Sequence, residues 1–388
     1  MSRHALKIGI LFSQTGSYAA VGSAMTAGAM LAIDEVNADP DAPVFLDPTV
    51  IDPGGSISAY AEGAQTLLRT HGITHVFGCY TSSSRKEILP IFEKDDGLLW
   101  YPSHYEGFET SDCVVYTGAA PNQHVIPLAQ HLLAHHGNRG WFVGSNYVWA
   151  WENNRILREA LQDAGGAVLG ERYFPVGETD LASLVEQILS DRPDFIFTTL
   201  IGESGFRFIH LLRDAATRVG VDQPRDLPIA SCSLSEVELP FIEGAAAGHL
   251  SSSVYFSTIA SKENDRFTSR WATQYGHLGN APADAEATYI AVHLLVRAVA
   301  RAGGRTDFDA VRDAVRGLQF PAPQGLVEVD PVNLHCAMRP RIGRSTENGT
   351  FELLYEAAGP IPPDPYLVWG NETFQGAVPG SGRLRVIQ

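Results

Sequence analysis

Paired cysteines are missing from this sequence. Its 388 residues contain four scattered cysteines, which form neither a Cys-x-x-Cys pair nor the spacing of Cys/His metal ligands. These residues are Cys79, Cys113, Cys232 and Cys336. We interpret them as reduced thiols of a cytoplasmic protein, because disulfides are rare in that compartment.

The common catalytic motifs are also missing. The sequence has no GxSxG, HExxH, Walker A or GxGxxG motif, and none of its four lysines stands in a phosphate-binding loop. A nucleophile–base pair of Ser82 and His104, oriented by Glu106, is conceivable but lacks an oxyanion-hole motif. Cys79 beside Lys86 suggests another nucleophile, although free cysteines are usually buried hydrophobic residues. We therefore predict that the protein is not an enzyme and has no cofactor.

Metal ligands are predicted to be absent as well. His131, His135 and His136 cluster on an expected helix with the i, i+4 spacing of metal ligands. His131 and His135 would share one face of the helix, but no third ligand accompanies them. We therefore interpret the cluster as a solvated helix end. A metal site is not expected.

Long apolar runs and basic runs are missing too. No stretch of 18 apolar residues predicts a membrane span, and Leu6–Phe12 is too short for a signal sequence. We therefore expect a cytoplasmic protein, or a periplasmic one if a leader was removed from an exported precursor. The net charge of −16 argues against binding nucleic acid or anionic lipid directly.

What the sequence does contain is a long alternation of strands and helices. Its length and its 45% of hydrophobic residues indicate two domains. Repeated βα units predict α/β lobes with mostly parallel sheets flanked by helices and joined by several hinge crossings. We predict a first lobe of residues 1–119 plus 254–322 and a second of residues 120–253 plus 323–388. Ligands would bind in the cleft between them.

Two consecutive expected strands end in small hydroxyls and aromatics. Ile73–Cys79 precedes Ser82 at the start of a helix, and Gly97–Tyr101 precedes Ser103 and His104. Ligands of open α/β sheets bind at such carboxyl ends of strands, near helix N-termini. The alternative is that the serines from Ser82 onward only cap the helix. The second polar strand end favours a binding site.

Five segments then resemble a known family. In order they are GCYTSSSRKEILPIFE (Gly78–Glu93), YPSHYEGFE (Tyr101–Glu109), YTGAAPNQ (Tyr116–Gln123), VGSNYVW (Val143–Trp149) and APQGLVEVDPVNLH (Ala322–His335). Together they resemble the amide- and urea-binding branch of the type I periplasmic-binding-protein superfamily, above all the cytoplasmic amide sensors of bacterial amidase operons. The resemblance extends from Lys7 to about Trp369. It implies a two-lobed receptor that closes over a small neutral amide or urea.

The resemblance also implies the site residues. By matching of segments, the ligand contacts are Ser82, Tyr101, Ser103, Tyr147 and Trp149, with Tyr80 and Ser233 as further wall residues. Three positions differ from the amide sensors: Ser103 replaces a threonine, His104 a proline and Trp149 a tyrosine. His104 is included in the predicted site because it adds a polar group there. These differences bear on which ligand the site accepts.

Chemistry and resemblance together leave three classes of function. The first is a cytoplasmic amide sensor that regulates amide or nitrile catabolism through an antiterminator-type protein partner and forms a homo-oligomer. The second is the solute-binding subunit of an ABC importer for urea or short amides, and the third is an amide-converting enzyme. Without a recognisable leader or a catalytic motif, the sequence favours the sensor. Ser82 would donate to the ligand carbonyl, and tyrosine and serine oxygens would accept from its NH2 group.

Overall fold

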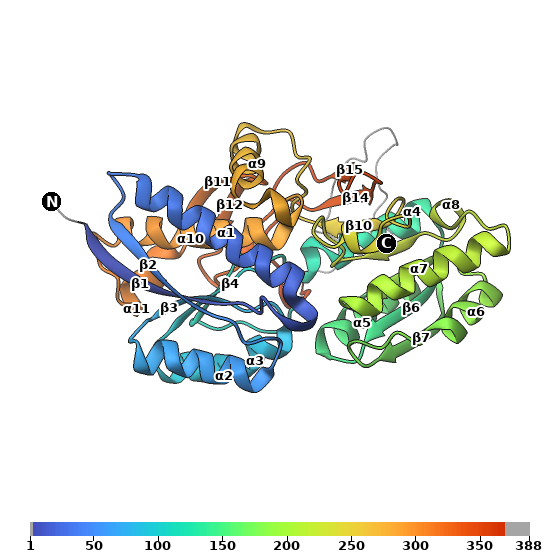
Figure 1. Ribbon diagram of the computed structural model, residues 1–388, viewed down its shortest axis with the longest axis horizontal. Coiled ribbons are helices and arrows are strands. Elements are labelled where there is room, and N and C mark those ends of the chain that lie inside the picture. The colour runs from blue at the N-terminus through green and yellow to red at the C-terminus, as the bar shows by residue number, and fades with distance from the viewer. Residues whose placement is uncertain (1–2, 369–388) are drawn as a thin grey trace.

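The computed structural model describes residues 3–368 and shows two lobes side by side (Figure 1). The chain leaves the first lobe after strand β5, returns after β10 and leaves it again after β13. Each lobe has a mostly parallel sheet with helices against it. The predicted two-lobed α/β fold is thereby confirmed.

The first lobe is built on a parallel sheet with strand order β2-β1-β3-β4-β5. Its strands are β1 (His4–Leu11), β2 (Val44–Ile51), β3 (His75–Gly78), β4 (Leu98–Tyr101) and β5 (Val114–Tyr116). Its helices are α1 (Ala19–Ala38), α2 (Ile57–Gln65), α3 (Ser82–Lys94), α9 (Lys262–Tyr275), α10 (Ala283–Arg301) and α11 (Phe308–Val315). Figure 1 shows α1 and α10 on one face of this sheet and α2 and α3 on the other.

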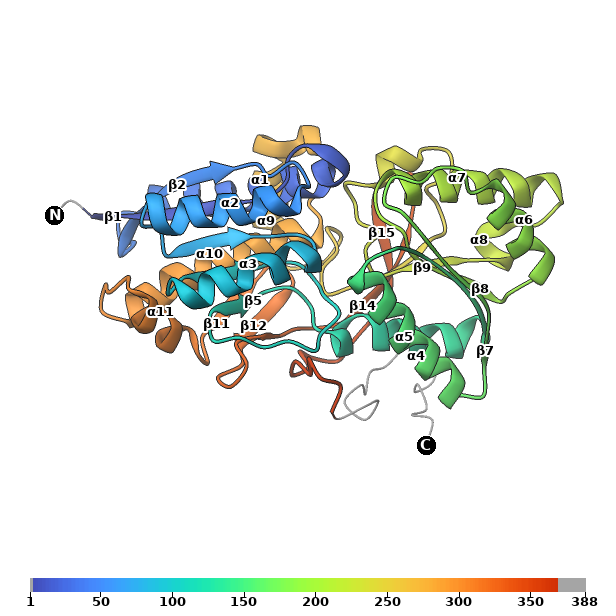
Figure 2. The same ribbon diagram turned by 90° about the horizontal axis from the view of Figure 1, so that it is seen from below.

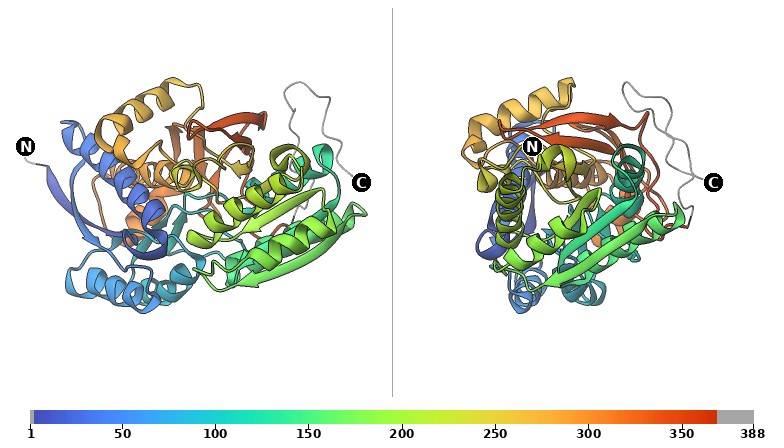
Figure 3. Two further views of the ribbon diagram at one scale, coloured as in Figure 1. Left: turned by 45° about the vertical axis from the view of Figure 1, so that its right-hand side comes forward. Right: turned by 90° about the vertical axis from the view of Figure 1, so that its right-hand side faces the viewer.

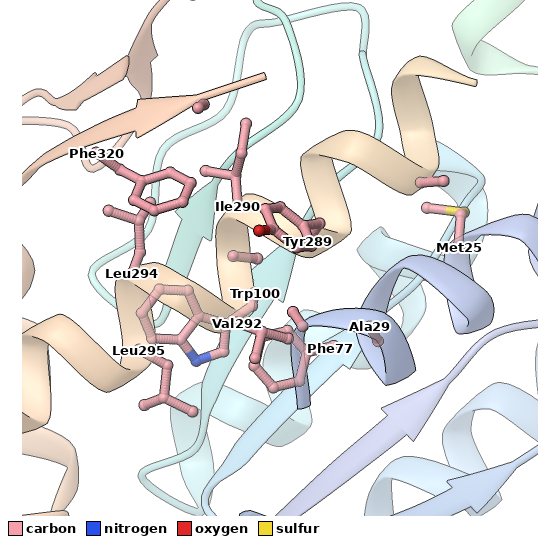
Figure 4. Close-up of a cluster of buried hydrophobic side chains, with 14 of the residues drawn as sticks. Met25, Ala29, Phe77, Trp100, Tyr289, Ile290, Val292, Leu294, Leu295 and Phe320 are labelled. Carbon is pink, nitrogen blue, oxygen red and sulfur yellow. The ribbon is translucent and has the colours of Figure 1, made fainter. Parts of the chain in front are cut away.

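Strands β3, β4 and β5 of this sheet are buried along their whole length because both faces of the sheet are covered there. Successive side chains point to opposite faces, so Phe77 and Trp100 pack under α1 and α10, whereas Val76 and Leu99 pack under α2 and α3. Figure 4 shows Phe77 and Trp100 beside the side chains of α10, and their ring centroids are 5.9 Å apart. Strands β3 and β4 contribute side chains to both faces of the sheet, and the ends of these two strands form one wall of the cleft.

Helix α10 returns to the first lobe after the whole second lobe has been made, and it packs closely on α1. A Cβ atom on Gly28 would lie 2.2 Å from the backbone oxygen of Ala285, so only glycine permits this approach. The segment Gly16–Ala38 is long and apolar enough to cross a membrane, which the sequence analysis had not anticipated. However, 61% of the apolar stretch is buried inside the fold, as expected for a core helix. This packing fixes the start of α10 near the cleft.

The second lobe has the strand order β15-β14-β10-β9-β8-β6-β7, in which β14 and β15 are antiparallel. Its strands are β6 (Arg139–Ser145), β7 (Ala167–Phe174), β8 (Phe195–Thr199), β9 (Ile229–Ser231), β10 (Leu250–Ser253), β14 (Arg341–Ser345) and β15 (Phe351–Glu356). Its helices are α4 (Val125–His135), α5 (Val148–Asp163), α6 (Ala182–Asp191), α7 (Glu203–Arg218) and the short α8 (Gln223–Asp226). Figure 3 shows this lobe from two further sides, with the last strands in red.

A third, antiparallel sheet joins the first lobe. It contains β11 (Gln319–Ala322), β12 (Gly325–Val329) and β13 (Cys336–Ala337), and β11 and β12 lie beside the first lobe (Figure 2). Val327, Val329 and Cys336 belong to the core that α1 and α10 form. We therefore place the last crossing after Met338 rather than near residue 322. The predicted second-lobe residues 369–388 lie outside the described residues.

Candidate functional site

The loop after β3 turns directly into helix α3, and Thr81 caps that helix. Its Oγ1 accepts a hydrogen bond from the backbone N–H of Ser84 at 3.2 Å, and Ser84 Oγ donates to the Thr81 carbonyl at 2.8 Å. Thr81 therefore performs the capping that the sequence analysis had considered for the serines from Ser82 onward. The hydroxyl of Ser82 is left for another role.

Six of the eight predicted site residues line one cavity between the lobes, which we call the serine–tryptophan cavity. Its volume is about 220 Å³. Its lining consists of Tyr80, Thr81, Ser82, Ser103 and His104 from the first lobe and Tyr147, Trp149 and Ile201 from the second. Residues from both lobes therefore meet around one small space, as the cleft prediction requires. Ile201 is a wall residue that the sequence analysis missed.

Aromatic rings close this cavity from both sides. The rings of His104 and Trp149 meet edge to face across the cleft, with centroids 5.5 Å apart. Tyr147 lies beside Trp149, with centroids 6.2 Å apart. The indole Nε1 of Trp149 is buried and has no hydrogen-bond partner among the described residues. The second lobe therefore offers a ligand one N–H donor and the rings of Tyr147 and Trp149.

Tyr101 lies behind the cavity wall rather than in it. The residue is fully buried, and its hydroxyl donates to the backbone carbonyl of Tyr80 at 3.0 Å. The geometry therefore corrects the direct amide contact expected of Tyr101, because its hydroxyl holds the Tyr80 backbone instead. Ser103 is held in place by a close backbone approach, since a Cβ atom on Gly118 would lie 2.0 Å from the Ser103 carbonyl oxygen.

Ser82 is tied to a buried ion cluster behind the wall. Its hydroxyl donates to Glu106, and Arg85 Nη2 lies 3.3 Å from the other oxygen of Glu106. Arg85 is fully buried, and its Nε lies 2.6 Å from Glu109. We call Arg85, Lys86, Glu106 and Glu109 the paired cluster, because its two positive and two negative charges balance. Burial would raise the pKa of Glu109, but Arg85 and Lys86 hold it at about 2.

Ser233 lies in a second cavity, of about 270 Å³, which we call the acidic cavity. Its lining includes two carboxylates that the sequence analysis did not place in the site, Glu236 after β9 and Asp284 in the first turn of α10. His104 lines both cavities, and its Nδ1 lies 3.7 Å from Asp284 Oδ1. Glu236 accepts a hydrogen bond from the backbone N–H of Ser257 at 2.8 Å.

The electrostatics of the acidic cavity differ from those of the paired cluster. Burial raises the pKa of Glu236 to about 7, and the charge of Asp284 adds to this. Glu238, which is buried nearby and accepts two hydrogen bonds from Ser235, has its pKa raised to about 7 for the same reasons. Within residues 3–368, neither lysine nor arginine lines either cavity. The cleft is therefore rich in hydrogen-bond acceptors and poor in fixed positive charge.

The geometry does not assemble the nucleophile–base pair that Ser82 and His104 could have formed. Ser82 donates to Glu106, and His104 makes no hydrogen bond to Ser82 in the described part of the chain. Burial raises the pKa of Cys79 to about 12, which keeps this thiol protonated. No group of three or more metal-ligating side chains lies together within residues 3–368, and His131, His135 and His136 only pack ring against ring.

Comparison with known proteins identifies the family. Residues 6–372 match the model of the periplasmic binding protein domain, which is nearly the whole chain. The chain belongs to this family. The Leu/Ile/Val-binding protein homolog 6 of Brucella abortus is 23% identical over 340 residues, which are 85% of each chain. The resemblance seen in the sequence is thus confirmed at the level of the family, whereas its amide-binding branch stays a prediction.

Solved structures agree with this fold. A solute-binding protein of an ABC transporter from Rhodopseudomonas palustris HaA2, in complex with p-hydroxybenzoic acid, matches with a TM-score of 0.84 and 19% identity. The match covers 94% of this chain and 99% of that chain. The leucine-binding protein LivK from Thermotoga maritima matches with a TM-score of 0.79 and 18% identity, over 90% of this chain and 98% of that chain. These neighbours are solute-binding proteins rather than enzymes.

Proposed function

We propose that this periplasmic-binding-protein chain is the solute-binding subunit of an ABC-type importer for small, polar, nitrogen-containing solutes such as urea or short amides. One observation carries the proposal: six residues predicted to bind an amide line one interlobe cavity, four from the first lobe and two from the second. A ligand that contacts both sets would hold the lobes together. That coupling between binding and closure is what an importer's receptor needs.

The cavity chemistry supports a neutral or N–H-donating solute over an anion. The hydroxyl proton of Ser82 is directed to Glu106, and its oxygen accepts from Arg85 Nη1 at 3.4 Å. The remaining lone pair makes Ser82 an acceptor for a ligand rather than the donor we expected from sequence. Trp149 Nε1 can supply a donor for a carbonyl oxygen. Three or four such hydrogen bonds, each about 0.5–1.5 kcal/mol, together with ring contacts give roughly micromolar affinity.

The relatives favour the importer over the cytoplasmic sensor that we had preferred from sequence. The solved neighbours include solute-binding proteins of ABC transporters, and the curated relative is named for Leu/Ile/Val binding. None of these descriptions supports an antiterminator partner, a homo-oligomer or a cytoplasmic location. Those three features remain predictions of the sequence alone.

Isothermal calorimetry would test the proposal with urea, acetamide, leucine and p-hydroxybenzoate. We expect urea or acetamide to bind, and we expect Trp149→Ala to abolish the signal. Trp151→Ala is the matched control, because Trp151 is exposed and follows on the same helix. Binding of leucine or p-hydroxybenzoate with no response to any urea, amide or related nitrogen compound would contradict the proposal.

A further inference from the structure

The side chain of Asp284 is a carboxylate of the cleft that has no hydrogen-bonded partner among the described residues. The residue is 4% exposed, and its carboxylate makes no hydrogen bond within residues 3–368. The nearest ionisable group is His104, whose Nδ1 lies 3.7 Å from Oδ1, which is beyond hydrogen-bonding distance. Buried carboxylates are normally paired or hydrogen-bonded. A buried carboxylate that lines a cavity and has no hydrogen bond therefore needs an explanation.

Other buried carboxylates of the first lobe show what normal pairing looks like. Glu35 accepts from the Tyr289 hydroxyl at 2.8 Å and lies 3.1 Å from Arg270. Glu286, two residues after Asp284 on the same helix, accepts from the backbone N–H and the side-chain amide of Gln324. The position of Asp284 in the first turn of α10 favours a negative charge, but it supplies no bonded donor. Its missing partner therefore distinguishes Asp284 from its neighbours.

The surroundings of Asp284 suit a positive group from outside the chain. Glu236 lines the same cavity from the opposite lobe, and no lysine or arginine lines that cavity among the described residues. The adjoining serine–tryptophan cavity presents the faces of Tyr147 and Trp149, and aromatic faces attract cations. A cation between the lobes would meet carboxylates from both of them.

We propose that the cleft binds a small organic cation whose charge lies on N–H groups, of the amidinium or guanidinium class, with Asp284 accepting from those groups. The proposal rests on the proposed function and narrows its ligand class. A planar cation of this kind has the shape of urea or an amide, and its N–H groups would reach Asp284 in the acidic cavity, which shares His104 with the serine–tryptophan cavity. The cation supplies Asp284 with N–H donors and a compensating positive charge. Such charge-assisted hydrogen bonds are stronger than neutral ones.

Calorimetry with two pairs of ligands tests this directly, because the two members of each pair have the same shape but differ in charge. The pairs are guanidinium with urea, and acetamidinium with acetamide. We expect the cation of each pair to bind roughly tenfold or more tightly. Asp284→Asn should bring the two members of each pair to similar affinity. Asp309→Asn is the matched control, because Asp309 lies in the first turn of another helix and is exposed, and it should leave the preference unchanged.

The outcomes separate this inference from the proposed function. If urea and acetamide bind as tightly as the cations, or more tightly, the inference is wrong and the proposed function stands. If neither cations nor neutral solutes bind to the natural protein, the proposed function is wrong too. Glu236→Gln gives a second variant should Asp284→Asn fail to fold, and it should also reduce the preference. An unchanged preference in both folded variants would overturn the role of the acidic cavity.

Discussion

The paired cluster and the acidic cavity use the same kind of side chain in opposite ways. Glu106 and Glu109 are neutralised by a fully buried arginine whose guanidinium also lies 4.6 Å from the ring centres of Tyr101 and Tyr105. Asp284 and Glu236 have no arginine or lysine in their cavity within the described residues. The first arrangement is complete in the protein by itself, whereas the second is not.

This difference indicates which charges stabilise the fold and which serve a ligand. A paired buried ion loses its compensation when its partner is removed, so the pair is sensitive to mutation. A buried acid without a hydrogen-bonded partner weakens the folded state, and a bound cation would relieve that cost. Ser82 connects the paired cluster to the serine–tryptophan cavity, since it donates to Glu106 and lines that cavity, and His104 lines both that cavity and the acidic cavity.

The largest expected effect concerns Arg85. Arg85→Met should reduce the free energy of unfolding by about 3–5 kcal/mol, because it leaves Glu106 and Glu109 buried without their main cation. Denaturant unfolding would measure this. Lys86→Met is the control and should cost about 1 kcal/mol or less, since the Lys86 side chain is 41% exposed. Equal losses in both variants would mean that the cluster does not depend on the buried guanidinium.

The second effect is a loss of stability as pH rises above 6.5. Burial raises the pKa of Glu236 and Glu238 to about 7 and that of Glu286 to about 8, so the folded state holds protons that the unfolded state has lost. Stability from these groups is therefore lost as pH rises through those values. Between pH 6.5 and 8 we expect a loss of roughly 3 kcal/mol.

The histidines define the lower limit of that window. Burial lowers the pKa of His75, His249 and His335 to about 4, so their contribution to stability is lost only as pH falls below about 6.5. Unfolding curves at pH 6.5 and 8 would isolate the glutamates. Glu238→Gln should make the loss smaller by roughly 1 kcal/mol. A pH-independent stability over this window would show that burial does not raise the pKa of these three glutamates in the folded protein.

The third expected effect is a loss of ligand affinity when Ser82 is replaced. Ser82→Ala should weaken ligand binding by about 1–3 kcal/mol, because Glu106 loses its donor and the ligand loses an acceptor oxygen. The melting temperature should also fall, because the buried Glu106 carboxylate loses a hydrogen-bond donor. Thr81→Ala, which removes the cap of α3 at a cost of about 1 kcal/mol, provides the scale for that fall. Calorimetry and melting curves on both variants would separate the two roles. Unchanged affinity in Ser82→Ala would remove Ser82 from the site.

The smallest expected effect is a change in the free energy of unfolding, opposite in sign to that of Arg85→Met. Asp284→Asn should leave stability unchanged or raise it by about 1 kcal/mol in the absence of ligand, since it removes a buried charge without a hydrogen-bonded partner. Denaturant unfolding of the ligand-free variant is the measurement. A loss comparable to that of Arg85→Met would mean that Asp284 is paired within the fold after all, and the contrast between the two regions would fail.

The sequence by itself determined the local part of this molecule. Strand–helix alternation predicted two parallel-sheet lobes, and short polar segments after consecutive strands predicted Ser82, Ser103 and His104 at one edge of the sheet, whereas Tyr80 came from the resemblance to a family. The fold prediction is confirmed, and the predicted residues lie close together, because a strand, its end and the following helix are neighbours in the chain. The carboxyl ends of adjacent parallel strands must also meet at one edge of the sheet. Tyr147 and Trp149 were reached only through the resemblance to a family.

Only the tertiary structure decided which charges are paired and which are not. Asp284 looked like an ordinary acidic residue in the first turn of a helix. The predicted lobe bounds placed that helix in the first lobe, but nothing local showed that its first turn would line the cleft. The close contact of Gly28 with Ala285 sets that position, and the two residues are far apart in sequence. Likewise, the direction of the Ser82 hydroxyl depends on Glu106, which a separate loop brings behind the wall. Long-range packing of this kind leaves no periodicity in the sequence, so the charge balance of the cleft could be seen only after folding.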